Sequence, residues 1–211
     1  WSAPVRDSRL LCFPHVVRGS YNVSAMMSSS GAALDWAAQN LGGRPGDVDA
    51  LFREIQPVAP GAEGLLFLPF LSPERFPVWD PRMRGGFVGL TLAHGRREMM
   101  RSVVESTGYA VRTVLAAMES SGCQPADLRV TGGQSRVPAW CQIRADMTGR
   151  KVLLPEQVEP DLVGNSCVGF YGLEDFESLA AAAESLVRFE RIFTPDPARA
   201  DVYAEMFDRF T

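Results

Sequence analysis

The sequence predicts an α/β domain in which helices pack on a sheet, and three observations carry this prediction. Strand-like and helix-like segments alternate along the last third of the chain, as expected for a sheet covered by helices. A long helix with an apolar stripe is predicted over residues 96–120. With 211 residues, 46% of them hydrophobic and 22% charged, the chain is long enough to bury a core. We therefore expect one domain over residues 1–211.

The first part of the chain predicts strands before helices. The expected elements are strands at residues 10–16 and 21–27, helices at 31–41 and 46–55, and a buried strand at 65–71. Gly19 provides turn chemistry between the first two strands. Ser28, Ser29 and Ser30 are N-cap candidates for the first helix, which Gly42-Gly43 can end. Residues 72–86 are dense in Pro, Arg and Asp and predict an ordered loop.

The second part begins with the long helix, whose expected inward face is apolar. Its stripe comprises Met100, Val103, Val104, Thr107, Val111, Val114, Leu115 and Met118. The elements expected after it are a strand at 128–131, a helix at 138–148, a strand at 151–154, and helices at 162–172, 178–190 and 197–210. This order predicts a sheet flanked by helices.

Charge and composition exclude several classes of function. A net charge of −4 argues against broad attraction to nucleic acid or to anionic membrane surfaces, because such attraction needs clustered positive charge. No apolar run approaches the roughly 20 residues that span a bilayer, and the N-terminal residues lack a signal-peptide core, so a cytoplasmic protein is expected. Lys151 lies outside any Gly-Lys-Ser/Thr pattern, which excludes a P-loop.

The cysteines and histidines suggest neither a metal centre nor a disulfide framework. The four cysteines are widely separated and are expected to be reduced packing residues. His15 and His94 lie far from any cluster with metal-ligand spacing, so no protein-held metal is expected.

Two segments meet the physical requirements of an anion or nucleotide site. In one, an apolar strand runs into Gly132 and Gly133 and then a helix, so that backbone N–H groups can approach a ligand closely. In the other, Ser28-Ser29-Ser30 follows a strand and delivers Gly31 to a helix N-terminus, whose N–H groups and dipole favour negative charge. Either segment alone is weak evidence for a site, and for a lone Gly-Gly turn an ordinary strand-to-helix connection is the preferred interpretation.

Four longer segments extend these two motifs. They are residues 30–36, residues 64–85 with Glu74-Arg75 and Trp79-Asp80-Pro81, residues 89–112, and residues 130–149 with Trp140, Gln142, Ala145, Asp146 and Gly149. In order and spacing they resemble the C-terminal domain of the FGGY carbohydrate kinases, the family that includes glycerol kinase and xylulokinase. The resemblance covers essentially the whole chain.

The resemblance implies a ribonuclease H-like domain of the actin/hexokinase ATPase type, with a twisted mixed sheet flanked by helices. ATP is expected in a cleft between two such domains, with Mg²⁺ held mainly through the nucleotide. By position in the family motifs, Gly31 is expected beside the phosphates and Asp35 near the nucleotide. Gly132, Gly133 and Gln134 are expected to line the adenosine pocket, although the family has glycine or alanine where Gln134 stands.

Val137 stands where the family often has serine or asparagine. Because an apolar side chain cannot hydrogen-bond the adenine edge, looser base selectivity is expected. Glu74, Arg75, Asp80 and Arg84 could be active-site groups, but an internally paired loop scaffold near the cleft is the preferred interpretation.

The resemblance also implies what this chain lacks. The family's catalytic aspartate and sugar-binding residues lie upstream of Trp1, so no catalytic residue is expected here, and the chain alone is expected to be inactive. The sugar, xylulose or a related compound, would be bound by the absent N-terminal domain, and a homodimer is possible. The rival hypothesis is a non-catalytic module of the same fold that uses ATP as a conformational switch.

Overall fold

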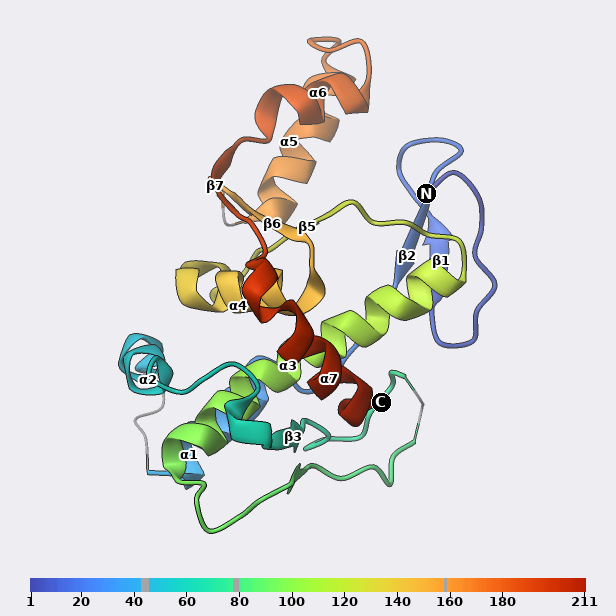
Figure 1. Cartoon of the computed structure of the whole chain (residues 1–211). Helices are drawn as coiled ribbons and strands as arrows, with labels where there is room; N and C mark the ends of the chain where they lie inside the picture. The colour runs from blue at the N-terminus through green and yellow to red at the C-terminus, as the bar shows by residue number, and fades with distance from the viewer. Residues whose placement is uncertain (43–45, 78–79, 158) are drawn as a thin grey trace.

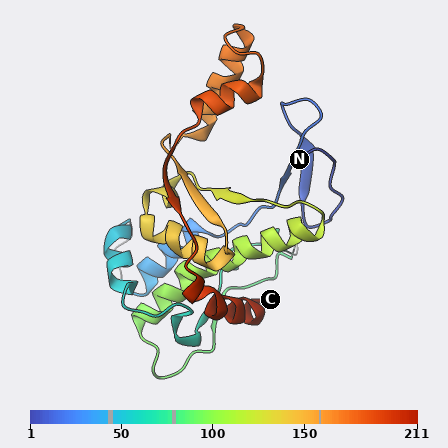
Figure 2. The same cartoon turned by 45° about the horizontal axis from the view of Figure 1, so that its top comes forward.

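The computed structural model describes residues 1–42, 46–77, 80–157 and 159–211. The long helix α3 (Arg96–Ser120) crosses the middle of the molecule, and the C-terminal helix α7 (Ala200–Phe210) lies across it (Figure 1). Figure 2 shows the same helix from another side, with α5 and α6 projecting away from it. Helix α3 is therefore the element around which most of the chain is arranged.

The N-terminal part forms two antiparallel strand pairs and two helices. Strands β1 (Leu11–Pro14) and β2 (Tyr21–Ser24) pair across a turn in which Gly19 has φ 79°. Strands β3 (Leu66–Leu68) and β4 (Gly86–Val88) form the second pair. Helices α1 (Gly31–Asn40) and α2 (Val48–Ile55) lie between these pairs in the sequence.

The C-terminal part contains a three-stranded mixed sheet. Strand β6 (Lys151–Pro155) lies in its centre, parallel to β5 (Asp127–Arg129) and antiparallel to β7 (Phe189–Phe193). Helix α4 (Pro138–Thr148) connects β5 to β6 and packs on the sheet through Cys141 and Ala145. The predicted mixed sheet with helices packed on it is confirmed in this region.

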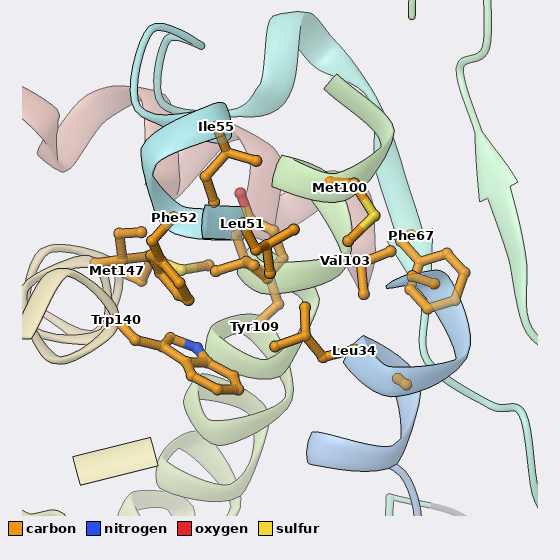
Figure 3. Close-up of a cluster of buried hydrophobic side chains, with 14 of the residues drawn as sticks. Leu34, Leu51, Phe52, Ile55, Phe67, Met100, Val103, Tyr109, Trp140 and Met147 are labelled. Carbon is orange, nitrogen blue, oxygen red and sulfur yellow. The ribbon is translucent and has the colours of Figure 1, made fainter. Parts of the chain in front are cut away.

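The main hydrophobic core lies where four helices and a strand meet on α3 (Figure 3). Side chains from α1, α2, β3, α3, α4 and α7 contribute, including Leu34, Leu51, Phe52, Ile55, Phe67, Met100, Val103, Tyr109, Trp140, Met147, Tyr203 and Met206. Phe52 and Trp140 pack with ring centroids 5.7 Å apart, which joins α2 to α4. Burial of this apolar surface is the main stabilising term available to the fold.

A buried ionic cluster joins α3 to α7. Glu105 is 1% exposed, and its Oε1 accepts from Arg101 Nε at 2.6 Å, the Tyr203 hydroxyl at 3.0 Å and the Gly61 N–H at 3.2 Å. Arg101 also donates to the Tyr203 hydroxyl at 2.9 Å. Burial beside the Glu105 carboxyl raises the pKa of Tyr203, so its hydroxyl keeps the proton that it donates.

The predicted helix at 178–190 is wrong over its last four residues, 187–190. Helix α6 (Leu179–Leu186) ends before Val187, whose backbone is extended (φ −83°, ψ 120°), and strand β7 follows. The alanine-rich run favours a helix, but Phe189, Ile192 and Phe193 favour a strand once β6 offers an edge. Strand β4 was also not predicted, because only three residues form it.

Most other predicted elements are confirmed, and their strands, except β6, are shorter than expected. The bounds of α3 and α4 agree with the predicted 96–120 and 138–148. The stripe of α3 differs toward its C-terminal end, where Val111, Val114 and Met118 are half-buried instead of lying in the core. All four cysteines are free, and three of them are buried.

Helices α5 (Pro160–Gly172) and α6 pack mainly against each other, at the end of the molecule farthest from α1 (Figure 1). Helix α5 buries Cys167 and leaves most of its other side chains exposed. Across the described ranges, no helix combines the length and the apolar character that a bilayer crossing requires.

Candidate functional site

The two glycine segments singled out in the sequence meet at one hollow of about 550 Å³. Gly31 and Asp35 line it from α1, and Gly133 and Gln134 line it from the turn before α4. The remaining lining residues are Leu34, Val48, Thr131 and Trp140. We call this site the glycine hollow. Most of the predicted nucleotide residues therefore lie together, although about 100 positions separate the two segments.

The α1 side of the glycine hollow is a helix N-terminus with open space before it. Gly31 is the first residue of α1, and a Cβ at this position would meet no atom within 4 Å. The Ser30 side chain caps no backbone N–H, and the first turn holds no acidic residue. The unpaired N–H groups in the first turn of α1, together with the positive end of the helix dipole, can therefore receive an anionic ligand.

The opposite side is the glycine turn that leads from β5 to α4. Gly132 has φ 75°, in the left-handed region that glycine adopts without strain. Ser135 holds the turn by donating from Oγ to the Gly132 carbonyl at 2.6 Å. Gly133 has no atom within 4 Å of a Cβ position, so the backbone presents an unshielded surface to the hollow.

Gln134 makes hydrogen bonds to both sides of the glycine hollow. Its Nε2 donates to Ser30 Oγ at 2.7 Å, and its Oε1 accepts from the Arg144 guanidinium on α4. Burial lowers the pKa of Arg144. The glutamine that replaces a family glycine or alanine thus makes two side-chain contacts that those residues could not make.

Val137 and Gly132 are not among the residues that line the hollow. Val137 is 6% exposed and packs in the core with Trp140 and Ile143, directly before α4. In the structure Val137 is thus a buried residue outside the lining of the hollow.

The loop residues Glu74, Arg75, Asp80 and Arg84 lie outside the glycine hollow and are bonded within their own loop. Glu74 and Asp80 form an isolated β-bridge. Asp80 pairs with Arg82 at 2.9 Å, and this pairing lowers the pKa of Asp80 to about 2. Arg84 donates to the carbonyl oxygens of its neighbours Pro81 and Met83. Trp79 of the Trp-Asp-Pro motif lies outside the described residues.

The same loop supports the serine run that leads into α1. Glu74 is 2% exposed, and its Oε1 accepts from the N–H groups of Ser28 at 3.0 Å and Arg75 at 2.8 Å. The hydroxyls of Ser29 and Ser72 form a second link at 2.9 Å. These bonds fix the direction in which the chain enters α1 and thereby position Gly31.

Sequence reasoning did not identify Trp140, Thr131, Leu34 and Val48 as lining residues. Trp140 is buried in the core with its Nε1 donating to Thr107 at 3.2 Å, and it also lines the hollow. Thr131 lies next to Gly132, so the glycine motif could have identified it as a lining residue.

The residues present fit a metal bound through its ligand better than a metal bound by protein alone. Among the described residues, no group of three or more His, Cys, Asp or Glu side chains gathers in one place. Asp35 is the carboxylate among the described lining residues of the glycine hollow. Mg²⁺ carried by nucleotide phosphates would find this single carboxylate as its protein-side oxygen group.

Comparison with known proteins identifies the family. Residues 3–173 match the model of the C-terminal domain of the FGGY family of carbohydrate kinases. The gluconokinase of Bacillus licheniformis is 29% identical over 214 residues, covering 96% of this chain and 41% of the relative. The xylulose kinase of Escherichia coli K12 is 34% identical over 146 residues, covering 69% of this chain and 30% of the relative.

A solved structure gives the same result. The xylulose kinase of Rhodospirillum rubrum matches with a TM-score of 0.87 and 32% identity, over 97% of this chain and 41% of that protein. The chain thus spans about two fifths of the length of such relatives. The expected actin/hexokinase-type fold is confirmed. On the match of residues 3–173, the chain belongs to the FGGY family of carbohydrate kinases and corresponds to its C-terminal domain.

Proposed function

We propose that this chain is the nucleotide-binding half of an ATP-dependent carbohydrate kinase that transfers the γ-phosphate to a hydroxyl of xylulose or a related sugar. The observation that carries the proposal is the glycine hollow, where the N-terminus of α1 and the Gly132-Gly133 turn face one space. Both segments offer backbone N–H groups to a polyanion, which is what phosphate binding requires.

Five of the lining residues have a role in this proposal. Gly31 lets the phosphates approach the N–H groups of α1, and Gly133 does the same on the α4 side. Asp35 orients the cation that accompanies the phosphates, and Trp140 with Leu34 offers the apolar surface that a purine requires. Bound Mg²⁺ supplies charge neutralisation between the phosphates.

The sugar and the base that deprotonates its hydroxyl are assigned to the part of the parent protein outside this chain. Phosphoryl transfer needs the attacking hydroxyl in line with the phosphate and a base beside it. Among the described lining residues of the glycine hollow, Asp35 is the carboxylate, and we assign it to the nucleotide side. The chain alone is therefore expected to bind ATP weakly and to phosphorylate no sugar.

The test of nucleotide binding is Gly133→Val. A valine fits the ligand-free fold, because Gly133 has open space beside it and does not require positive φ, but its side chain occupies the space beside the ligand. The Kd for Mg·ADP, measured by calorimetry, should rise about tenfold or more, or about 1.4 kcal/mol. Gly86→Val, also in open space but on β4, is the control and should leave the Kd unchanged.

The test of catalysis compares the chain with its full-length parent in an ADP-release assay with D-xylulose and D-gluconate. The parent should turn over in a magnesium-dependent way, and the 211-residue chain should not. Sugar-dependent turnover by residues 1–211 would contradict the division of labour proposed above. A parent that binds nucleotide and acts on no sugar would favour the switch module.

A further inference from the structure

The side chain of Gln134 connects segments that lie 104 positions apart. Its amide nitrogen donates to Ser30 Oγ at 2.7 Å, directly before α1, and its amide oxygen accepts from Arg144 in α4. Because the amide has both a donor and an acceptor end, it can serve both partners at once. One side chain thereby joins the two sides of the glycine hollow.

Both partners depend on this amide. The Ser30 hydroxyl makes no capping bond to α1, so its contact in the described structure is with Gln134. The Arg144 guanidinium is partly buried, and its Nε has no partner among the described groups. Gln134 Oε1 is therefore the acceptor that compensates this cation, because burying a charged group without a hydrogen-bond partner is costly.

The anchoring by Arg144 gives the contact with Ser30 its direction. With Oε1 held from α4, the Nε2 end of the amide points to the opposite side, where Ser30 begins α1. An unanchored glutamine on a turn would lose more rotamer freedom on forming the same bond. The amide is thus pre-ordered as a bridge before any ligand arrives.

We propose that Gln134 is a positioning residue, whose amide holds the N-terminus of α1 and the turn before α4 at the separation that nucleotide binding requires. The inference rests on the proposed function of the glycine hollow. A site assembled in advance binds more tightly, because less conformational freedom is lost when the ligand arrives.

A double-mutant cycle on the 211-residue chain tests this inference, with Ser30→Ala, Gln134→Ala and the double variant. Calorimetry with Mg·ADP should show a Kd raised about three- to tenfold by each single change, the range that one hydrogen bond of ordinary net strength provides. The double variant should be no weaker than Gln134→Ala, because both changes break the same bond. Additive effects would overturn the proposal.

Two further variants separate positioning from general damage. Ser30→Thr keeps the hydroxyl, and its Kd should lie within about twofold of the Kd of the unsubstituted 211-residue chain. Ser166→Ala removes a hydroxyl on α5, away from the hollow, and should leave the Kd unchanged. If Ser30→Thr were as weak as Ser30→Ala, the hydroxyl would not be the positioning group.

Hydrogen exchange in the absence of ligand distinguishes failure of this inference from failure of the proposed function. The Ala33 N–H donates to the Ser30 carbonyl at 3.2 Å and reports on the first turn of α1. In both single variants its exchange should be about three- to tenfold faster than in the unsubstituted chain. In the double variant it should be no faster than in Gln134→Ala. If exchange changes in this way but the unsubstituted 211-residue chain fails to bind Mg·ADP, the proposed function is contradicted and the positioning role of Gln134 still holds. Unchanged exchange in Gln134→Ala would overturn the link itself.

Discussion

Helices α3 and α5 show that burial in this molecule does not follow composition. In α3, every residue from Met100 to Tyr109 is buried, including the charged Arg101 and Glu105. In α5, Cys167 is the buried residue, whereas large apolar side chains such as Val168 and Phe170 are exposed. The difference lies in the surroundings: α1, α2, α4 and β3 pack on α3, and α6 packs on α5. Neighbouring elements, and not residue type, decide what is buried.

Most buried polar groups of α3 are tolerated because they have hydrogen-bond partners, although the buried Tyr109 hydroxyl has none among the described residues. The hydroxyls of Ser102, Ser106 and Thr107 donate to carbonyl oxygens three positions earlier, at 2.7 to 2.9 Å. Glu105 and Arg101 pair with each other and with Tyr203. Buried polar groups that are hydrogen-bonded avoid most of the desolvation cost. A substitution at any of these buried, hydrogen-bonded residues should therefore lower the stability of the fold.

The largest effect is expected for Glu105→Ala in α3. The change leaves Arg101 as a buried cation without its carboxylate, which should remove about 3–5 kcal/mol of the unfolding free energy. This is a large part of the roughly 5–15 kcal/mol that typically separates a folded protein from its unfolded state. Guanidinium denaturation followed by circular dichroism measures it.

Asp161→Ala is the matched control in α5. Asp161 is exposed in the first turn of α5, where its negative charge interacts favourably with the positive end of the helix dipole. Its loss should therefore cost at most about 1 kcal/mol. Equal losses at positions 105 and 161 would show that the contrast between the two helices is wrong.

An intermediate effect is expected for Gly108→Ala in α3. The added Cβ would lie 2.3 Å from Met147 Sδ, so the core must shift, at a cost of about 1–3 kcal/mol. Thermal unfolding measures the loss. In the double variant Gly108→Ala with Met147→Ala, the cost should be smaller than the sum of the single costs, because the shorter side chain removes the clash. Strict additivity would contradict the packing described for this pair.

The smallest effect, of opposite sign, is expected for Gly169→Ala in α5. A Cβ at this position meets nothing within 4 Å, and alanine favours a helix interior over glycine by about 0.8–1.0 kcal/mol. The melting temperature should therefore rise. A fall would show that another surface packs against α5 in solution.

The sequence predicted best those elements whose signals are local. The bounds of α4 follow from Pro138 at the first helical position and from Gly149, which ends the helix with φ 65°. Short motifs likewise predicted that each glycine segment leads into a helix. Gly31 and Gly133, predicted from separate motifs, both line the hollow.

What could not be predicted depends on contacts between distant segments. Strand β7 exists because β6 offers an edge to residues that otherwise read as the end of a helix. Val137 lies in a core cluster to which the distant elements α1, α2, β3, α3 and α7 also contribute side chains. The bond between Gln134 and Ser30 joins residues 104 positions apart, so no local pattern contains it. Periodicity reports the environment of a residue only when its neighbours are also near in the chain.

The buried cluster of α3 also has a consequence for synthesis on the ribosome. Tyr203 follows Glu105 by 98 positions, so at about 5–20 residues per second the phenol appears on the order of 5–20 s after the carboxylate. During this interval a nascent α3 carries Arg101 and Glu105 without the helix that covers them. The growing chain must keep this face hydrated or shielded by a chaperone until α7 has been translated.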